Sequence, residues 1–392
     1  MNRAFLVLLL SGATASLAAQ SVLNVGPNAT YPDIQSAILA AAPGDVILIA
    51  PGTYQPFTLD RALTLRTDSP GGAVTVTGDT LTGVTVHLAA SAHARIDGLY
   101  FLGRIDLAPP SGAAQGGVLS MTDVVAESPL SVLGSNLVLT NCECVGPLTN
   151  GVGFAGITLN GGSALSASGC AIHGTHTTSF LVGGAGIEAA NSSVVHLSNC
   201  TVVGGDSVSH VSVLLGSALA LRDQARAWVV DSDLSVLPTM LAAPAIVVAN
   251  TSSSPVLLER CTLDNGGALV PLTSGAVLNH LLLGISTPNA VVAPGGTVQV
   301  DFRTQPGLFV AYHVSFTVTA PNANPLLAEL EWGFLASSLF LGFLQPDPQG
   351  LATAVLPIPN LPGITHLPLW FCGWTATDLP VEVSPLAAVV LR

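Results

Sequence analysis

The sequence predicts an all-β protein in which short parallel strands stack into a solenoid and a β-sandwich follows. Three observations predict this fold: a strand pattern that recurs through the middle of the chain, a single short helix pattern before the first apolar strand, and a gathering of aromatic residues after about residue 284. No helical pattern separates the repeated strands, which excludes βαβ crossovers.

The first 19 residues are predicted to be a secretory signal peptide. Asn2-Arg3 precedes the apolar run from Ala4 to Leu10, and small residues follow, with Ser16 and Ala18 suiting cleavage after Ala18. The run is too short to span ~30 Å of hydrocarbon, and no later segment is predicted to cross a bilayer. We therefore expect an exported, secreted or cell-surface protein whose first domain begins at residue 20.

Composition excludes several classes of partner. Charged residues make up 8% of the chain and apolar residues 49%, so the chain has enough apolar side chains for a large core. It contains no Lys, ten Arg, and a formal net charge of −13. Nucleic acids and anionic membrane surfaces need a basic footprint, so neither is expected as a partner.

A short helix over residues 33–42 is predicted to cap the solenoid. Its single apolar stripe consists of Ile34, Ala37, Ile38 and Ala41. Asp33 suits the N-cap, and Pro43-Gly44 suits the end of the helix. The unbroken apolar run from Val46 to Ala50 predicts a strand buried on both faces. A helix lying across the open end of such strands would cover their unpaired edges.

The middle of the chain repeats about every 28 residues, a period typical of solenoids. Each repeat contains a short apolar strand that ends in Cys or Asp. These strands are Leu119–Asp123, Val138–Cys142, Leu165–Cys170, Val195–Cys200, Val229–Asp233 and Leu257–Cys261. One coil cannot bury its own inner face, so neighbouring coils must stack at ~4.8 Å.

The capping helix followed by the first strand resembles the N-terminal cap and first coil of right-handed parallel β-helix proteins of the pectin-lyase-like superfamily. The resemblance implies a right-handed parallel β-helix with a short N-terminal capping helix, followed here by a C-terminal β-sandwich. We assign residues 1–19 to the signal peptide, 20–283 to the β-helix and 284–392 to the sandwich-like domain. The catalytic motifs of polygalacturonases and pectin methylesterases are missing from the sequence.

Four of the six cysteines occupy the last position of the repeated strand, so we expect them in one column of the solenoid. They are Cys142, Cys170, Cys200 and Cys261. Asp123 and Asp233 are expected at the same position in their own coils. A column of metal ligands or disulfides is one interpretation. A ladder of reduced, buried and unreactive thiols is favoured, because no C-x-x-C pair occurs and parallel side chains suit the disulfide torsion poorly.

The best acidic cluster is the group Asp231, Asp233, Glu259 and Asp264, with Arg260 beside it. Asp231 and Asp233 are two residues apart on a predicted strand and so are expected to share a face. The cluster suits a Ca²⁺ or sugar site, but paired charges on a solvated outer face are favoured. A second, weaker candidate is formed by the histidines His173, His176, His196 and His210. No catalytic, cofactor or metal residue is assigned.

The last part of the chain predicts a small β-sandwich, because short strands alternate there with Pro-Gly turns. It holds most of the Phe and Trp residues, and Trp370 and Trp374 suit either core packing, which is favoured, or stacking against sugars.

The sequence thus favours a non-catalytic extracellular protein with a structural, adhesive or carbohydrate-binding role, whose partners are polysaccharides or cell-surface components, and no cofactor is expected. The alternative is a divergent polysaccharide lyase or glycoside hydrolase with a site between about residues 170 and 264. Ca²⁺ belongs only to that alternative, and the base of a lyase would then be Arg222, Arg226 or Arg260.

Overall fold

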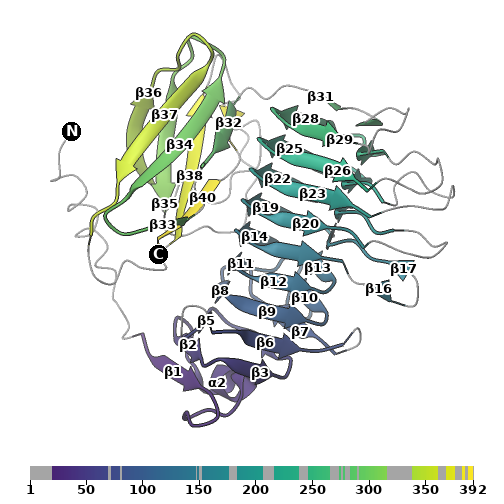
Figure 1. The fold of residues 1–392 in the computed structure, drawn as a ribbon, viewed down its shortest axis with the longest axis vertical. Helices are drawn as coiled ribbons and strands as arrows, with labels where there is room; N and C mark the ends of the chain where they lie inside the picture. Colours follow the sequence, from purple (N-terminus) through teal and green to yellow (C-terminus); the bar gives the residue numbers. More distant parts are fainter. Residues whose placement is uncertain are drawn as a thin grey trace.

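The computed structural model shows a right-handed parallel β-solenoid with a β-sandwich packed on one side of it (Figure 1). The residues that the structure describes are 20–68, 72–79, 82–146, 148–149, 152–175, 183–205, 216–237, 246–264, 273–274, 277–278, 283–288, 291–315, 338–360, 368–375, 382–384 and 387–391. The predicted signal peptide, His176 and His210 lie outside them. Within the described part of the chain, no helix has the length and hydrophobicity of a membrane span.

Three parallel sheets, here called A, B and C, form the solenoid. Sheet A consists, in order, of β1 (Val22–Val25), β2 (Val46–Ile49), β5 (Thr64–Thr67), β8 (His93–Asp97), β11 (Val118–Thr122), β14 (Asn136–Thr140), β19 (Ala164–Ser168), β22 (Val194–Ser198), β25 (Arg226–Val230), β28 (Val256–Glu259) and β31 (Val277–Leu278). Sheet B consists of β3 (Gly52–Tyr54), β6 (Val74–Thr77), β9 (Leu99–Leu102), β12 (Val125–Glu127), β15 (Glu143–Val145), β20 (Ala171–His173), β23 (Thr201–Gly204), β26 (Asp233–Val236) and β29 (Thr262–Asp264). Sheet C consists of β4 (Thr58–Leu59), β7 (Val84–His87), β10 (Ile105–Ala108), β13 (Leu130–Leu133), β18 (Ile157–Asn160), β21 (Ile187–Ala189), β24 (Leu219–Leu221), β27 (Val248–Asn250) and β30 (Thr273–Ser274). The hairpin β16 (Leu148–Thr149) and β17 (Val152–Gly153) projects from one coil.

Each coil passes through the sheets in the order A, B, C, and alternate side chains of every strand point into the solenoid. The inward column of sheet A contains Ile47, Leu65, Ile96, Met121 and Leu139, all of them buried. These side chains join those of sheets B and C in one apolar core that runs the length of the stack. The core exists only because neighbouring coils bury each other's inner faces, as the repeat predicts.

The predicted cap is confirmed. Helix α2 (Ile34–Ala40) begins after Asp33, whose carboxylate accepts the backbone N–H of Ser36 at 2.7 Å. All four residues of the predicted stripe, Ile34, Ala37, Ile38 and Ala41, are buried. The helix packs beside β1 and β2 at the N-terminal end of the stack, and Gly44 follows in a left-handed conformation with φ +97°.

The strand after the cap departs from its prediction. Ile47 and Ile49 are buried, but Val46 and Leu48 on the other face are half-buried. The sequence pattern was consistent with burial on both faces, which requires a second layer over the outer face. Val46 and Leu48 belong to none of the apolar clusters that the described residues form, whereas the cluster that packs against the sandwich begins at β11.

The column of four cysteines is confirmed by the strand register. Thr140, Ser168, Ser198, Val230 and Glu259 pair in sequence across sheet A, which places the residues two positions later in one line. This line contains Cys142, Cys170, Cys200, Ser232 and Cys261. All six cysteines are free, and three of the four column thiols are buried, whereas Cys261 is half-buried.

The two aspartates predicted in this column lie one residue away from it. Ser232 occupies the place predicted for Asp233, and Val124 occupies the place predicted for Asp123. The reason is the turn between sheets A and B, which needs one residue in the left-handed conformation before the column position. Asp123, with φ 51°, holds that left-handed place, and Asp231, with φ 47°, holds it in the later coil. Asp233 begins the next strand.

A β-sandwich of two sheets follows the solenoid. The first sheet contains β32 (Leu283–Ser286), β34 (Thr297–Thr304) and β37 (Leu351–Pro357). The second contains, in order, β33 (Val291–Val292), β40 (Ala387–Leu391), β38 (Pro368–Thr375), β35 (Val310–Ser315) and β36 (Leu339–Leu344), with β39 (Glu382–Val383) beside β38. Their facing side chains, among them Phe302 and Phe371, form a second apolar core.

The outer face of sheet A packs against the second sheet of the sandwich. A small apolar cluster crosses this interface and consists of Val118, Val138, Ala164, Val194, Trp228, Val230, Trp370, Cys372 and Ala388. The ring of His93 lies 6.0 Å from Trp370, and that of His196 lies edge-on to Trp228 at 4.8 Å. Trp370 was predicted in a core, and it is buried here, between the two parts of the chain.

Candidate ligand-binding site

The turn from sheet A to sheet B repeats one backbone conformation in successive coils. In each of these turns one residue has a positive φ, and this residue precedes the inward column that holds the thiols. The residues at this left-handed position are Gly98, Asp123, Asn141, Gly169, Asn199, Asp231 and Arg260. Gly, Asn and Asp tolerate this conformation best, so the polar side chains gather here for a backbone reason. The result is a row of polar groups along one outer corner of the solenoid.

Arg260 is the exception in this row, and its ion pairs explain its place. Its Nε and Nη2 atoms each lie 2.5 Å from a carboxylate oxygen of Asp231, a bidentate pair between adjacent coils. Its Nη1 atom also donates to Glu259. Burial raises the pKa of Glu259, although the nearby positive charge of Arg260 acts to lower it. The guanidinium is therefore fixed by two carboxylates.

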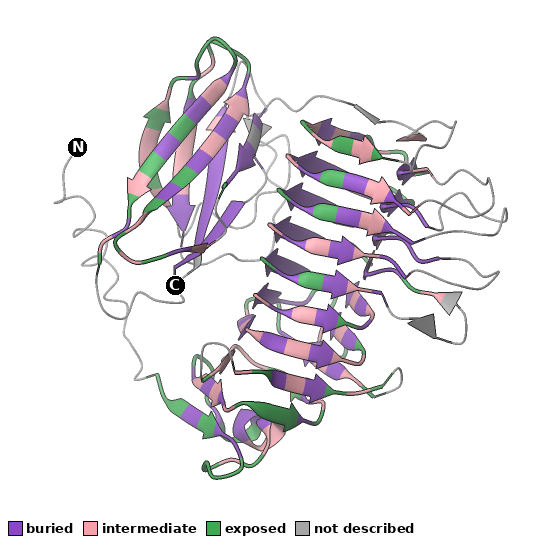
Figure 2. Cartoon of the chain, viewed as in Figure 1, coloured by how far each residue is buried: buried purple, intermediate pink, exposed green. Residues whose placement is uncertain are grey.

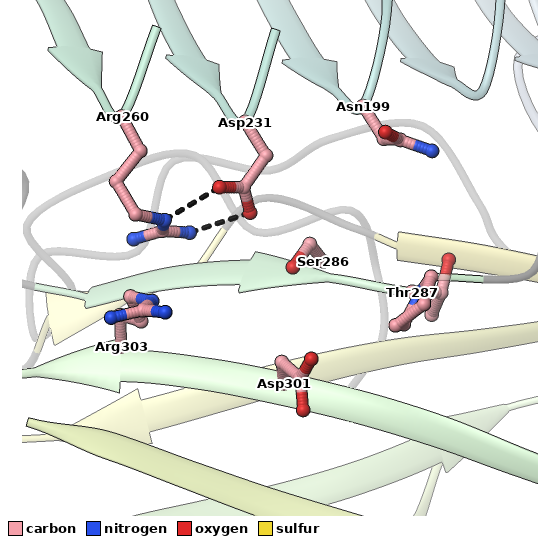
Figure 3. Close-up of a pocket in the computed structure, with 8 residues that line it drawn as sticks. Asn199, Asp231, Arg260, Ser286, Thr287, Asp301 and Arg303 are labelled. Atoms are coloured by element: carbon pink, nitrogen blue, oxygen red, sulfur yellow. Dashed lines mark hydrogen bonds and ion pairs between the residues drawn. The ribbon is translucent and has the colours of Figure 1, made fainter.

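A cleft of about 250 Å³ lies between this corner and the sandwich (Figure 3). The solenoid contributes Asn199, Asp231 and Arg260 to its lining. The sandwich contributes Asp301 and Arg303 from β34, together with Ser286 at the end of β32 and the two residues after it, Thr287 and Pro288. The charges of the two aspartates and two arginines in the lining sum to zero, so the cleft has no excess of positive or negative charge. Its side chains offer both hydrogen-bond donors and acceptors.

Hydrogen bonds hold the sandwich side of the cleft in place. Ser198 of β22 donates its hydroxyl to the carbonyl of Ile285 at 3.1 Å, which ties β32 to the solenoid. Thr287 donates to the carbonyl of Ala388 at 3.3 Å. The carboxylate of Asp301 accepts from Gln299 at 3.0 Å and from Thr353 at 2.7 Å. The walls of the cleft therefore belong to packed elements of both parts of the chain.

The structure brings together only part of the predicted acidic cluster. Asp231 and Glu259 both contact Arg260, whereas Asp233 and Asp264 lie exposed at the ends of strands β26 and β29 in sheet B. The prediction that Asp231 and Asp233 share a face is wrong, because a left-handed turn at Asp231 separates them. The favoured interpretation, charges paired between Arg and carboxylates, is what the structure shows for Asp231 and Glu259.

The other candidate residues lie apart from this cleft. Arg222 pairs with Glu188, and Arg226 lies over the ring of Trp228 at 5.5 Å. His173 is half-buried on β20, whereas His196 is fully buried in the interface with the sandwich. Among the residues that the structure describes, no three His, Cys, Asp or Glu side chains are grouped so that they could hold a metal ion.

No protein-family model matches this chain, and no curated protein does.

Asp301 and Arg303 are the charged residues of the cleft that the sequence analysis did not predict. They alternate with buried apolar residues along β34, in the pattern Val298-Gln-Val-Asp-Phe302, which predicts only a strand with one polar face. Their position opposite Asp231 follows from how the sandwich packs on sheet A. No local motif in the sequence contains this information.

Proposed function

We propose that this chain is an exported, non-catalytic protein that binds carbohydrate, with one sugar residue of a glycan held in the cleft between the solenoid and the sandwich. The observation that carries the proposal is the lining of the cleft. Two carboxylates, two guanidinium groups, an amide and two hydroxyls converge there from two packed parts of the chain. A sugar ring presents vicinal hydroxyls that both donate and accept hydrogen bonds, and such a lining matches them.

The charge and size of the cleft narrow the class of ligand. Because the lining has no net formal charge, we propose a neutral sugar rather than a polyuronate. A volume of about 250 Å³ is below the range of ~300–1,000 Å³ typical of pockets that enclose a drug-sized molecule. It therefore suits a single ring at the end or side of a longer glycan.

The ion pairs favour binding over catalysis. A general acid or base has to exchange a proton with the substrate, whereas a carboxylate that accepts two hydrogen bonds from one guanidinium already has both of its oxygens engaged. Asp231 is in this state. The alternative, a divergent polysaccharide lyase or glycoside hydrolase with a site on the coils between about residues 170 and 264, would need an acid and a base other than Asp231. Membership of the pectin-lyase-like superfamily is likewise our proposal, supported by the parallel β-solenoid and its N-terminal cap.

A glycan array followed by calorimetric titration tests the proposal. We expect Arg303→Ala to weaken binding about tenfold or more, because hydrogen bonds to charged groups contribute ~1.5–3 kcal/mol. Arg104→Ala is the matched control: Arg104 pairs with Asp106 on the outer face of sheet C and its loss changes the net charge equally. Equal affinity of the Arg303 variant and the wild type would exclude this cleft as the binding site.

A second assay addresses the alternative. The mature protein is incubated with acidic polysaccharides, with and without Ca²⁺, and unsaturated products are measured by their absorbance. Their release would contradict a non-catalytic role.

A further inference from the structure

The outermost described strand of the second sandwich sheet, β36, has the features of a pairing surface. β36 lies at the edge of its sheet and pairs with β35 only. Its other edge has no partner among the strands that the structure describes. Its sequence, Leu-Phe-Leu-Gly-Phe-Leu, contains no charged residue. Phe343 and Phe340 are 69% and 43% exposed, respectively. In Figure 2, exposed segments are drawn in green on this strand at the outer edge of the sandwich. Natural edge strands are usually protected by short length, charge, proline or a bulge, because an apolar edge pairs readily with another strand, and of these features β36 has only a bulge.

A bulge places both phenylalanines on one face of the sheet. The register between β35 and β36 shifts between Tyr312 and His313, so that Phe343 lies opposite Ala311 and Phe340 lies opposite His313. The two rings then meet edge-on at 5.1 Å, although they are three residues apart in the chain. The leucines of β36 pack instead on the core of the sandwich.

The exposed rings continue the interface that the sandwich forms with the solenoid. Trp374 packs against the interface cluster, His313 stacks on Trp374 at 5.0 Å, and Phe340 lies 5.3 Å from His313. One aromatic row thus runs across the outer face of the second sheet. The solenoid covers the end of this row near Trp370, and the end near Phe343 is exposed.

The sequence of β36 is self-complementary. In an antiparallel pair of two copies centred between Leu341 and Gly342, each Leu339 would face Leu344 of the other copy. Each Phe340 would face Phe343 in the same way, and Leu341 would face Gly342, the residue without a side chain. A two-fold axis requires such a match, since the same surface has to meet itself.

We propose that β36 pairs antiparallel with β36 of a second copy of this chain, joining the two second sheets into one continuous sheet. Four phenylalanine rings then lie together on one face. The formal net charge of −13 makes copies of this chain repel each other over most surfaces, and the uncharged β36 is a place where they meet without that penalty. A six-residue strand pair buries less than the ~1,600 Å² of a standard interface, so the dimer is expected to be concentration-dependent.

Sedimentation velocity of the mature full chain over a range of concentrations tests this pairing. The wild type is expected to shift reversibly from monomer to dimer. Phe343→Lys places a positive charge on β36, as natural edge strands often do to prevent pairing. We expect it to raise the dissociation constant of the dimer at least about tenfold. Leu133→Lys is the matched control, because Leu133 is a 51% exposed apolar residue on sheet C of the solenoid, and it should dimerise as the wild type does.

Two further measurements keep the result decisive. Circular dichroism and the thermal midpoint show that both variants are folded, and hydrogen exchange shows whether the amides of 339–344 become protected as the concentration of the wild type rises. A wild type that stays monomeric throughout would overturn the proposal. So would a dimer that Phe343→Lys leaves intact, or one that both variants weaken equally.

Discussion

The hydroxyl of Ser232 accepts the backbone N–H of Cys200 at 3.0 Å, as the thiol of Cys170 accepts the N–H of Cys142 at 3.4 Å. Each group also donates to the carbonyl two residues before it, at 2.7 Å for Ser232 and 3.3 Å for Cys170. The column is therefore a ladder of hydrogen bonds as well as a row of small buried side chains. This explains why a serine can occupy one place in it.

The ladder predicts an unusual order of stability at Cys170. Cys170→Ser keeps a donor and an acceptor, whereas Cys170→Val is of similar volume but leaves the buried N–H of Cys142 without its partner, at a cost of ~1–3 kcal/mol. We therefore expect the serine variant to unfold at higher denaturant concentration than the valine variant. If packing alone mattered, valine would be the more stable, and equilibrium unfolding in urea distinguishes the two orders.

The thiols are predicted to react slowly in the native protein. Burial raises the pKa of Cys144 and Cys170 well above the ordinary value and that of Cys261 to about 11, and the thiolate is the reactive form. Burial acts in the same direction on Cys200, but hydrogen bonds, the strongest of them with the thiol of Cys170, lower its pKa below the ordinary value. Cys200 is only 2% exposed, so a thiol reagent cannot reach it in the folded protein. With an aromatic disulfide reagent, the native protein should react much more slowly than the denatured protein, which should release six equivalents. An intact mass that shows two or more disulfides among the column cysteines would contradict this.

The cap predicts a large difference between two neighbouring substitutions. Ile38 is buried against the first coil, and Leu39 beside it is 67% exposed. Ile38→Asp should lower the free energy of unfolding by several kcal/mol, because it buries an unpaired charge. Leu39→Asp, with the same charge change on the same helix, should have little effect. Equal thermal midpoints for the two variants would mean that the helix does not dock on the strands in solution.

The interface with the sandwich is predicted to weaken in acid. Burial and the charge of Arg95 lower the pKa of His93 to about 4, and burial and Arg226 lower that of His196 to about 3. The unfolded chain, with a histidine pKa near 6.5, binds these protons more readily than the folded one. Stability is therefore complete above pH 6.5 and falls as the pH drops toward 4, by up to ~3 kcal/mol for His93 alone.

Substitution of the two histidines by glutamine tests this pH dependence. Between pH 6.5 and 5, the wild type should lose stability with a slope that approaches two protons, and His196→Gln should reduce that slope by about one. The double variant, which also carries His93→Gln, should lose the contribution of both histidines to this slope. An unchanged slope in the double variant would assign the acid sensitivity to other groups.

The solenoid could be predicted from the sequence because each coil repeats the same short pattern of residues. The period of small residues and cysteines, the cap at Asp33 and the apolar stripe of its helix are local signals, and each predicts its element. The error at Asp233 is also local. A turn with one left-handed residue shifts the column by one position, and Asp is common both at such turns and at strand ends.

The candidate site could not be predicted in the same way, because it forms where two distant parts of the chain meet. The sequence predicted Arg260 next to its acidic neighbours. In the sequence, however, Arg303 and Asp301 are ordinary polar residues of a strand, and they line the cleft only because the sandwich packs on sheet A. His196 was predicted as a weak candidate residue on the repeated strand Val195–Cys200, and its burial was missed for a related reason. It lies in the middle of β22, and only the covering of that outer face makes a buried histidine possible there.

The covering of sheet A by the sandwich also limits how the protein can change in length. Whole coils of a solenoid can in principle be duplicated or lost, since every coil offers the same ends to its neighbours. Here the sandwich contacts the solenoid at two separate levels of the stack, through Trp370 against His93 of β8 and through the carbonyl of Ile285, which accepts the hydroxyl of Ser198 of β22. Removal of one coil between β8 and β22 would bring these two levels one strand spacing, ~4.8 Å, closer together beneath a sandwich of unchanged size. The distance between the two contact points on the sandwich therefore fixes how many coils can lie between them.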